Sequence, residues 1–273
     1  MELTVNGAPA YCYTGGKPVT PDTLAGRPTV VFVHGVLGDH SVWTPLARYF
    51  AHHGWNVLAP DLPGHCRSGG EAPSSVEEAA GFIAALLDAA GVGQAALVGH
   101  SWGSLIALET AARLQGRITH LALVGTAFPM KVSPALLESA LHTPQQALAL
   151  VQTFSRSTLA PPSGAGSWVH GAGLALGRRV LASNPQANVF HRGFQACDRY
   201  ANGEAAMAAV ACPVLFVLGA QDQMTPPKAA QGLVRAARAA GKAVTVASVP
   251  VGHHQMAEAP EETLRALRDF LAP

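Results

Sequence analysis

The chain has 273 residues, of which 49% are hydrophobic and 13% are charged, and its formal net charge is +1. Its length fits one large α/β domain, alone or with an insertion, and its high hydrophobic fraction excludes a disordered chain. The nearly balanced charge gives no indication of a nucleic acid or an anionic membrane surface as a partner.

The N-terminal residues and the cysteines predict the cellular compartment. The first residues lack the basic start and long apolar core of a signal peptide, and no apolar stretch could span a membrane without a polar interruption. The four cysteines (Cys12, Cys66, Cys197 and Cys212) are scattered and form no CxxC pair. We therefore expect free thiols in a reducing cytoplasm, with a Cys197–Cys212 disulfide as the alternative.

Strand and helix patterns alternate through the first 127 residues. Asn6 and Gly7, between two short β-like runs, predict a hairpin. The β-branched run at 28–35 predicts a strand that is buried on both faces. Ser75 is a suitable N-cap for a helix, and Glu78 stands at the capping-box position. The other expected strands are 55–64, 95–101 and 120–127, and the expected helices are 41–53, 75–91 and 102–114.

The pattern changes between residues 128 and 209, where short helix-like pieces alternate with glycine-rich breaks and no parallel strand is evident. Strand–helix alternation then returns, with strands expected at 212–222 and 242–250 and helices at 226–241 and 258–272. Alternation on both sides of the segment predicts one mostly parallel, doubly wound sheet wrapped by helices. We therefore expect an α/β core of residues 1–127 and 210–273, with 128–209 inserted as a helical cap.

The candidate catalytic residues lie at the expected ends of strands. In an open parallel sheet, ligands bind at the carboxyl ends of the strands. Four predicted ends, interpreted as neighbours, carry the glycine loop HGVLGDH, Ser101, Asp222 and His253. A serine hydroxyl is a poor nucleophile near neutral pH unless a base takes its proton and a third group orients that base. Ser101, His253 and Asp222 are therefore the candidate nucleophile, base and acid.

Ser101 lies between Gly99 and Gly103, where a strand is expected to become a helix. So tight a turn strains the serine backbone and leaves room only for small neighbours. The helix that begins at Trp102 directs its dipole at developing negative charge. We expect the backbone N–H groups of Trp102 and Val36 to bind an oxyanion, since a glycine before Val36 lets that loop approach.

Five motifs follow one another at these strand ends: HGVLGDHSVW, DLPGHCRSGG, GHSWGS, LGAQDQMTPP and VGHHQMAEAPE. With them the chain resembles a capped, carboxylesterase-like serine hydrolase of the α/β-hydrolase fold family over essentially its full length. The resemblance implies Ser101 as nucleophile, Asp222 as acid and His253 as base, with Val36 and Trp102 as oxyanion donors. Such chemistry needs no cofactor, and the scattered histidines predict no metal site.

Several positions leave alternatives open. Relatives often have glycine where Cys66 and Ser104 stand; we expect Cys66 to narrow its loop or make it oxidisable, and Ser104 to tighten helix packing. His254 is the alternative to His253 as base; the resemblance favours His253, since the family's usual base directly follows a glycine, as His253 does. Asp61, in the DLPG motif, is interpreted as stabilising its own turn.

The expected function is hydrolysis of a carboxylic ester or thioester with a small to medium, mostly apolar acyl group. A carbon–carbon bond hydrolase and a cofactor-free perhydrolase would use the same triad, and a ligand receptor on this fold is a third alternative. The expected cap has six basic and three acidic residues, a net +3, interpreted mainly as a solvated surface. Guidance of an anionic substrate or an acidic acyl carrier by Arg178 and Arg179 is the alternative.

Overall fold

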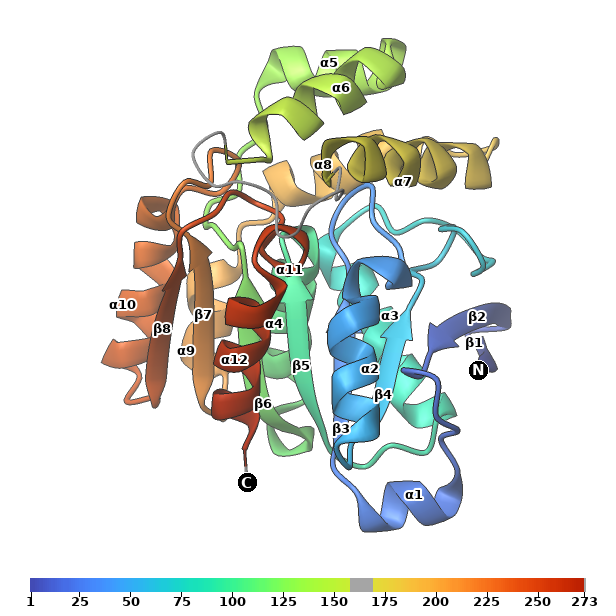
Figure 1. The fold of residues 1–273 in the computed structure, drawn as a ribbon, viewed down its shortest axis with the longest axis vertical. Coiled ribbons are helices and arrows are strands. Elements are labelled where there is room, and N and C mark those ends of the chain that lie inside the picture. Colours follow the sequence, from blue (N-terminus) through green and yellow to red (C-terminus); the bar gives the residue numbers. More distant parts are fainter. Residues whose placement is uncertain (158–168, 273) are drawn as a thin grey trace.

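The computed structural model describes residues 1–157 and 169–272, and within them one sheet of eight strands runs through the molecule (Figure 1). The strand order is β1-β2-β4-β3-β5-β6-β7-β8. Strands β3 to β8 run parallel to one another, whereas the β1–β2 and β2–β4 pairs are antiparallel. The prediction of a mostly parallel α/β sheet is therefore confirmed. The strands are β1 (Glu2–Val5), β2 (Ala8–Tyr13), β3 (Thr29–Val33), β4 (Asn56–Pro60), β5 (Ala95–His100), β6 (Ile118–Val124), β7 (Val214–Gly219) and β8 (Val244–Val249).

Helices cover both faces of the sheet (Figure 1). Those before β6 are α1 (Pro21–Gly26), α2 (Thr44–His52), α3 (Val76–Ala89) and α4 (Trp102–Arg113). Those between β6 and β7 are α5 (Pro134–His142), α6 (Pro144–Phe154), α7 (Val169–Ser183), α8 (Val189–Arg199) and α9 (Gly203–Ala209). Those after β7 are α10 (Gln231–Ala239), α11 (Gln255–Glu258) and α12 (Pro260–Leu271). Short 3-10 turns occur at η1 (His40–Trp43), η2 (Gln115–Arg117) and η3 (Pro227–Ala230).

The central strands supply two apolar cores, one on each side of the sheet. In β3, Val31 and Val33 pack with α3 and α4, whereas Val30 and Phe32 pack with α2 and α12. All five residues of β3 are buried, because side chains of a strand alternate between faces and helices cover both. This explains why the four residues from Val30 to Val33 are all apolar instead of alternating with polar ones.

Two local predictions can be compared with the structure. Asn6 and Gly7 both have positive φ, 50° and 79°, as the two central residues of a type I′ hairpin require, so the hairpin is confirmed. Ser75 caps α3, and its Oγ accepts the Glu78 N–H at 3.1 Å. The carboxylate of Glu78 instead accepts the N–H of Ser74 at 2.8 Å, so the reciprocal half of the capping box is displaced by one residue. Helix α1, which Thr20 caps, was not predicted.

The segment between β6 and β7 divides its helices between two places. Helices α5, α6 and α7 lie above the carboxyl ends of the strands, with α8 beneath them (Figure 1). Helix α9 packs in the helix layer against α4 and α10, and its Met207 belongs to the core under that layer. The expected cap of residues 128–209 thus includes a helix that packs on the core, and its residues 158–168 lie outside the described residues.

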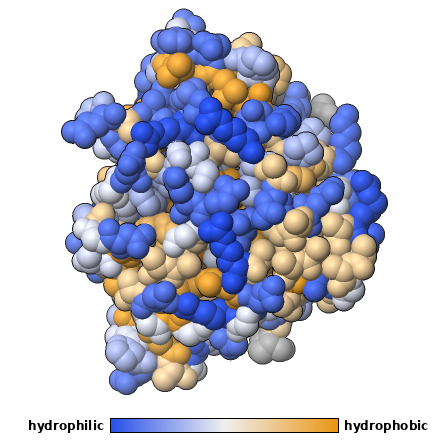
Figure 2. Space-filling view, turned by 180° about the vertical axis from the view of Figure 1, so that it is seen from behind, coloured by the Kyte–Doolittle hydropathy of each residue, from blue (hydrophilic) through white to orange (hydrophobic). Residues whose placement is uncertain are grey.

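The helices, the surface and the cysteines of the described residues bear on further expectations. None of the helices in 1–157 and 169–272 combines the length and apolar character needed to cross a membrane. Seen from behind, hydrophilic and hydrophobic residues mix over the surface, with hydrophobic groups near the top where α5 and α6 lie (Figure 2). Exposed apolar side chains on these helices are Leu141, Leu150 and Phe154. All four cysteines are free, as predicted.

Candidate active site

Ser101 occupies the turn between β5 and α4 with φ 54° and ψ −121°, in the left-handed half of backbone space. A non-glycine residue adopts such a conformation only where its surroundings enforce it. Here two glycines allow neighbouring backbone segments to approach the turn closely. A Cβ at Gly99 would overlap the backbone of Gly103, and a Cβ at Gly103 would overlap the carbonyl oxygen of Val33. The strained strand-to-helix turn predicted around Ser101 is present.

Ser104 ties this turn to the neighbouring strand. Its Oγ lies 2.5 Å from the carbonyl oxygen of Ser101 and 2.8 Å from Oγ1 of Thr126, which follows β6. Strand β6 lies between β5 and β7, so the ends that carry Ser101 and Asp222 are not neighbours. The prediction of four neighbouring strand ends is wrong in this respect, because β6 pairs directly with the strand that precedes it in the chain.

Asp222 and His253 form a buried pair at the ends of β7 and β8. Nδ1 of His253 lies 2.8 Å from Oδ2 of Asp222, and Oγ1 of Thr225 donates to the same oxygen at 2.7 Å. Burial opposes the charge of Asp222, but the charge and hydrogen bond of His253 and the bonds from Thr225 outweigh it and lower the pKa of Asp222 to about 2. An ionised Asp222 holds the ring proton on Nδ1, which leaves Nε2 free to accept another proton.

His254 has different surroundings. Burial and the charge of His253 lower the pKa of His254 to about 4, so its ring is neutral near neutral pH. Among the described residues its Nε2 has no hydrogen-bond partner, and its backbone N–H donates to Oε1 of Glu258 at 3.1 Å. Because the carboxylate of Asp222 contacts His253 and not His254, the geometry favours His253 as the base.

Glu258 holds the loop that carries both histidines. Its carboxylate accepts the N–H groups of Ser157 at 2.8 Å, Gly252 at 3.2 Å and His254 at 3.1 Å. The N–H of His253 donates to the carbonyl oxygen of Ser155 at 2.7 Å. Glu258 and Thr225 lie within two of the motifs, but no role could be predicted for them, because only the folded loops bring them to the triad.

The expected oxyanion donors, Val36 and Trp102, lie next to each other under α8. A Cβ at Gly193 of α8 would be 2.9 Å from Cγ2 of Val36 and 3.5 Å from Cε3 of Trp102. Trp102 is the first residue of α4, where a backbone N–H has no partner within the helix. Leu37 has φ 59°, which the sequence did not predict; it completes a turn closed by the Gly38 N–H and the carbonyl oxygen of residue 35.

A cavity of about 610 Å³ opens beside these residues, and both Ser101 and His253 line it. Most of its other lining side chains are apolar and come from the loops after β3 and β7, from α11 and from the helices above. They include Val36, Leu37, Val42, Leu176, Phe194 and Met224. Polar residues also line the cavity, among them Gln152 of α6, Ser155 directly after α6, and Arg179 of α7. The site is therefore an apolar pocket with a few convergent polar groups, as small-molecule sites commonly are.

Comparison with known proteins identifies the family. The family model described as "alpha/beta hydrolase fold" matches residues 28–167, a little over half of the chain. The chain belongs to the alpha/beta hydrolase fold family. This hydrolase is 35% identical to the lipase LipV of Mycobacterium tuberculosis over 103 residues, 38% of this chain and 39% of that protein. It spans only 26–39% of the length of three such curated relatives.

Solved structures show the same fold over the whole chain. The enol-lactonase from Burkholderia xenovorans LB400 superposes with a TM-score of 0.82 and 22% identity, covering 100% of both chains. An N-acyl homoserine lactone degrading enzyme superposes with a TM-score of 0.79 and 20% identity, covering 99% of this chain and 100% of its own. At such identities the likeness establishes the fold of this hydrolase.

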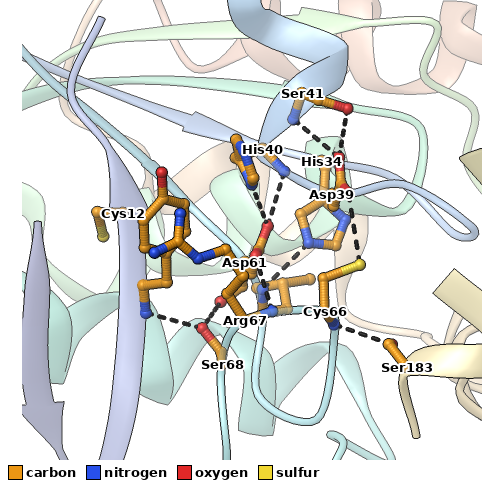
Figure 3. A network of polar contacts seen from close by, with 12 residues as sticks. Cys12, His34, Asp39, His40, Ser41, Asp61, Cys66, Arg67, Ser68 and Ser183 are labelled. Atoms are coloured by element: carbon orange, nitrogen blue, oxygen red, sulfur yellow. Dashed lines mark hydrogen bonds and ion pairs between the residues drawn. The ribbon is translucent and has the colours of Figure 1, made fainter. Parts of the chain in front are cut away.

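A polar network beside the pocket of the hydrolase surrounds two buried aspartates (Figure 3). Asp61 accepts the backbone N–H and Nδ1 of His40, both at 2.8 Å, and lies within its own turn, away from the histidine loop. Asp39 lies 2.6 Å from Nη2 of Arg179 on α7 and 3.4 Å from Sγ of Cys66. Asp39, His40 and Asp61 together could approach one cation, but the Arg179 guanidinium already neutralises Asp39.

The network explains the unusual Cys66. Its φ of 43° lies in the left-handed region that glycine adopts readily. Burial and the charge of Asp39 raise the pKa of the Cys66 thiol to about 12. A protonated thiol is a poor nucleophile, which argues against the expected oxidisable loop.

The Asp39–Arg179 ion pair predicts a pH-dependent stability. Burial opposes the charge of Asp39, but hydrogen bonds from Ser41 and Arg179 lower the pKa of Asp39 to about 2. A lowered carboxyl pKa stabilises the folded state above the unfolded-state pKa near 4, and this stabilisation is lost as pH falls through about 2. We expect Asp39→Asn to lower the free energy of unfolding at pH 7 by about 2 kcal/mol.

Urea unfolding of both proteins at pH 7, 4 and 2.5 would measure this effect. The difference between wild type and Asp39→Asn should be unchanged from pH 7 to pH 5 and should shrink below pH 4. A difference of the same size at pH 2.5 as at pH 7 would show that the Asp39 charge contributes nothing.

Proposed function

We propose that this hydrolase cleaves carboxylic esters or thioesters with a small to medium, mostly apolar acyl group through an acyl-enzyme. The observation that carries the proposal is the buried Asp222–His253 pair, which faces the same apolar pocket as Ser101 on its strained turn. A lipase and two enzymes named for lactones are among the similar proteins, and lactones are cyclic esters.

In the proposed reaction Ser101 Oγ attacks the carbonyl carbon while Nε2 of His253 takes its proton. Nδ1–H of His253 donates to Asp222, whose charge stabilises the imidazolium that forms. The N–H groups of Val36 and Trp102 donate to the oxyanion, and each such donor typically lowers the barrier by about 3 kcal/mol. His253 then protonates the leaving oxygen or sulfur. In the second half of the reaction His253 takes a proton from water, which attacks the acyl carbon, and His253 returns the proton to Ser101 Oγ as the acid is released.

The nucleophile and base complete their contact when substrate binds. Among the described residues Ser101 Oγ has no hydrogen-bond partner, and such contacts are often long before substrate arrives. We further propose that helices α5 to α8, within the segment 128–209, cap the core formed by 1–127 and 210–273. Lining residues from α6, α7 and α8 support this division.

Burst kinetics on 4-nitrophenyl butanoate test the proposal. Wild type should release one equivalent of 4-nitrophenol per active site in a fast phase and then turn over steadily, because an activated ester acylates Ser101 faster than water hydrolyses the acyl-enzyme, which accumulates. Ser101→Ala should show neither phase while its circular dichroism matches that of wild type. A folded wild type without burst or turnover would favour a carbon–carbon bond hydrolase or a ligand receptor instead.

A further inference from the structure

Helices α6 and α7 pack closely above the pocket because α7 has two glycines four residues apart. A Cβ at Gly173 would overlap the side-chain amide of Gln152, and one at Gly177 would overlap the side chain of Leu148. Gln152 and Leu148 are also four residues apart, on one face of α6. The run GAGLALG at 171–177 therefore serves helix packing, and Gly173 makes room for a buried amide over the pocket.

Gln152 and Ser155 are buried without hydrogen-bond partners. Their exposed fractions are 4% and 0%, and among the described residues neither Oε1 of Gln152 nor Oγ of Ser155 has a partner. Both residues line the pocket. Buried polar groups are nearly always hydrogen-bonded, and leaving one unpaired is unfavourable. These two groups lie three residues apart beside one pocket and stay unpaired unless a ligand supplies their partner.

The position of Ser155 shows which part of a substrate the pair meets. Its carbonyl oxygen accepts the N–H of His253 at 2.7 Å and would lie 2.6 Å from a Cβ at Gly252. The pair is therefore on the histidine side of the pocket. In the proposed reaction His253 delivers the proton to the leaving group, which must depart on that side. The pair faces the alcohol half of an ester.

Resting on the proposed function, we propose that Gln152 and Ser155 bind a hydroxyl group on the alcohol half, so that monoesters of diols or polyols are preferred substrates. A hydroxyl both donates and accepts, so it can satisfy the amide of Gln152 and the hydroxyl of Ser155 together. The ligand hydroxyl can donate to the amide oxygen of Gln152 or accept from its amide nitrogen, so the proposal does not depend on which way the amide is turned. A site built around a hydroxyl rejects an analogue that lacks it, because its own polar groups then stay unpaired.

Matched esters of butanoic acid test this inference. The probes are 2-hydroxyethyl butanoate, its isostere propyl butanoate, and 2-methoxyethyl butanoate, which cannot donate; 3-hydroxypropyl and butyl butanoate repeat the comparison one carbon longer. We expect wild-type kcat/KM to be about tenfold higher for the hydroxyl ester of at least one length than for its isostere. Gln152→Leu, which keeps the volume, should bring this ratio close to one by slowing the hydroxyl ester alone.

Two features separate recognition from a structural effect. All these esters form the same butanoyl-enzyme, so the deacylation rate constant should be equal in wild type and Gln152→Leu. Gln146→Leu, at an exposed position of α6 outside the pocket, should keep the wild-type ratio. The inference is overturned if wild type shows no preference at either length, or if Gln152→Leu keeps the preference, while ester hydrolysis itself still stands.

Binding to Ser101→Ala tests the pair without catalysis. NMR titration of this variant with the same ester pairs should give a lower Kd for the hydroxyl ester, and adding Gln152→Leu should remove the difference. If wild type hydrolyses none of the esters but this binding preference is present, the proposed function fails and the inferred subsite stands. Equal binding of both esters would overturn the subsite, whatever the enzyme hydrolyses.

Discussion

Replacing His253 with alanine should lower kcat on 4-nitrophenyl butanoate by about 10⁴-fold, whereas His254→Ala should keep kcat within about tenfold of wild type. The two rings are adjacent in sequence, but only His253 contacts the ionised Asp222, at 2.8 Å, and Oγ1 of Thr225, at 3.0 Å. Without that carboxylate an imidazole is not held in one tautomer, and its charged form is not stabilised.

The surroundings of the two histidines make the comparison decisive. With a pKa of about 4, His254 is neutral over the pH range in which esterases are assayed, and its Nε2 has no partner among the described residues. His254 lines the pocket, so its alanine variant can change KM. The measurement is steady-state kcat for both variants, with folding checked by circular dichroism. Loss of activity in His254→Ala together with activity in His253→Ala would reverse the assignment of the base.

Much of the fold could be predicted because burial on both faces leaves a strong local signal. Every residue of β3 and of β5 is buried, so both strands are visible as apolar runs, and each ends in a motif with small and polar residues. Such apolar runs do not predict the order of the strands in the sheet. That β6 separates the ends carrying Ser101 and Asp222 follows from which strands pair, and this depends on contacts between distant segments.

The site was predictable only to the extent that its residues lie in motifs. Ser101 has flanking glycines that a close approach requires, whereas nothing local distinguishes Thr225 or Glu258 from ordinary loop residues. Their roles arise when loops after different strands meet, as when Glu258 accepts the N–H groups of Ser157 and of the histidine loop.

The helices above the pocket were the least predictable part. Helical periodicity can indicate that α6 and α7 exist, but it does not show which face of each lies over the strand ends. Gln152 is an ordinary polar residue of α6 in the sequence. It becomes a candidate recognition residue only because Gly173 of α7 admits its amide into the interface beside the pocket.

Gly103→Ala should lower the free energy of unfolding by about 3 kcal/mol or more, whereas Gly81→Ala should raise it by about 0.5–1 kcal/mol. Both glycines lie in helices, Gly103 in α4 and Gly81 in α3. A Cβ at Gly81 would meet nothing within 4 Å, so alanine brings only its higher helix propensity. A Cβ at Gly103 would overlap the carbonyl oxygen of Val33 and lie 2.5 Å from that of His34.

The carbonyl groups in front of Gly103 cannot move aside easily. Val33 ends β3 and pairs with Gly99 of β5, so its backbone is held by the neighbouring strand. Urea unfolding of wild type, Gly103→Ala and Gly81→Ala measures both effects in one series. If Gly103→Ala proved as stable as wild type, α4 would have to shift away from β3 and carry the Trp102 N–H with it. Steady-state kinetics would then show a lower kcat at unchanged stability, and a variant with both properties unchanged would contradict the close packing of the turn.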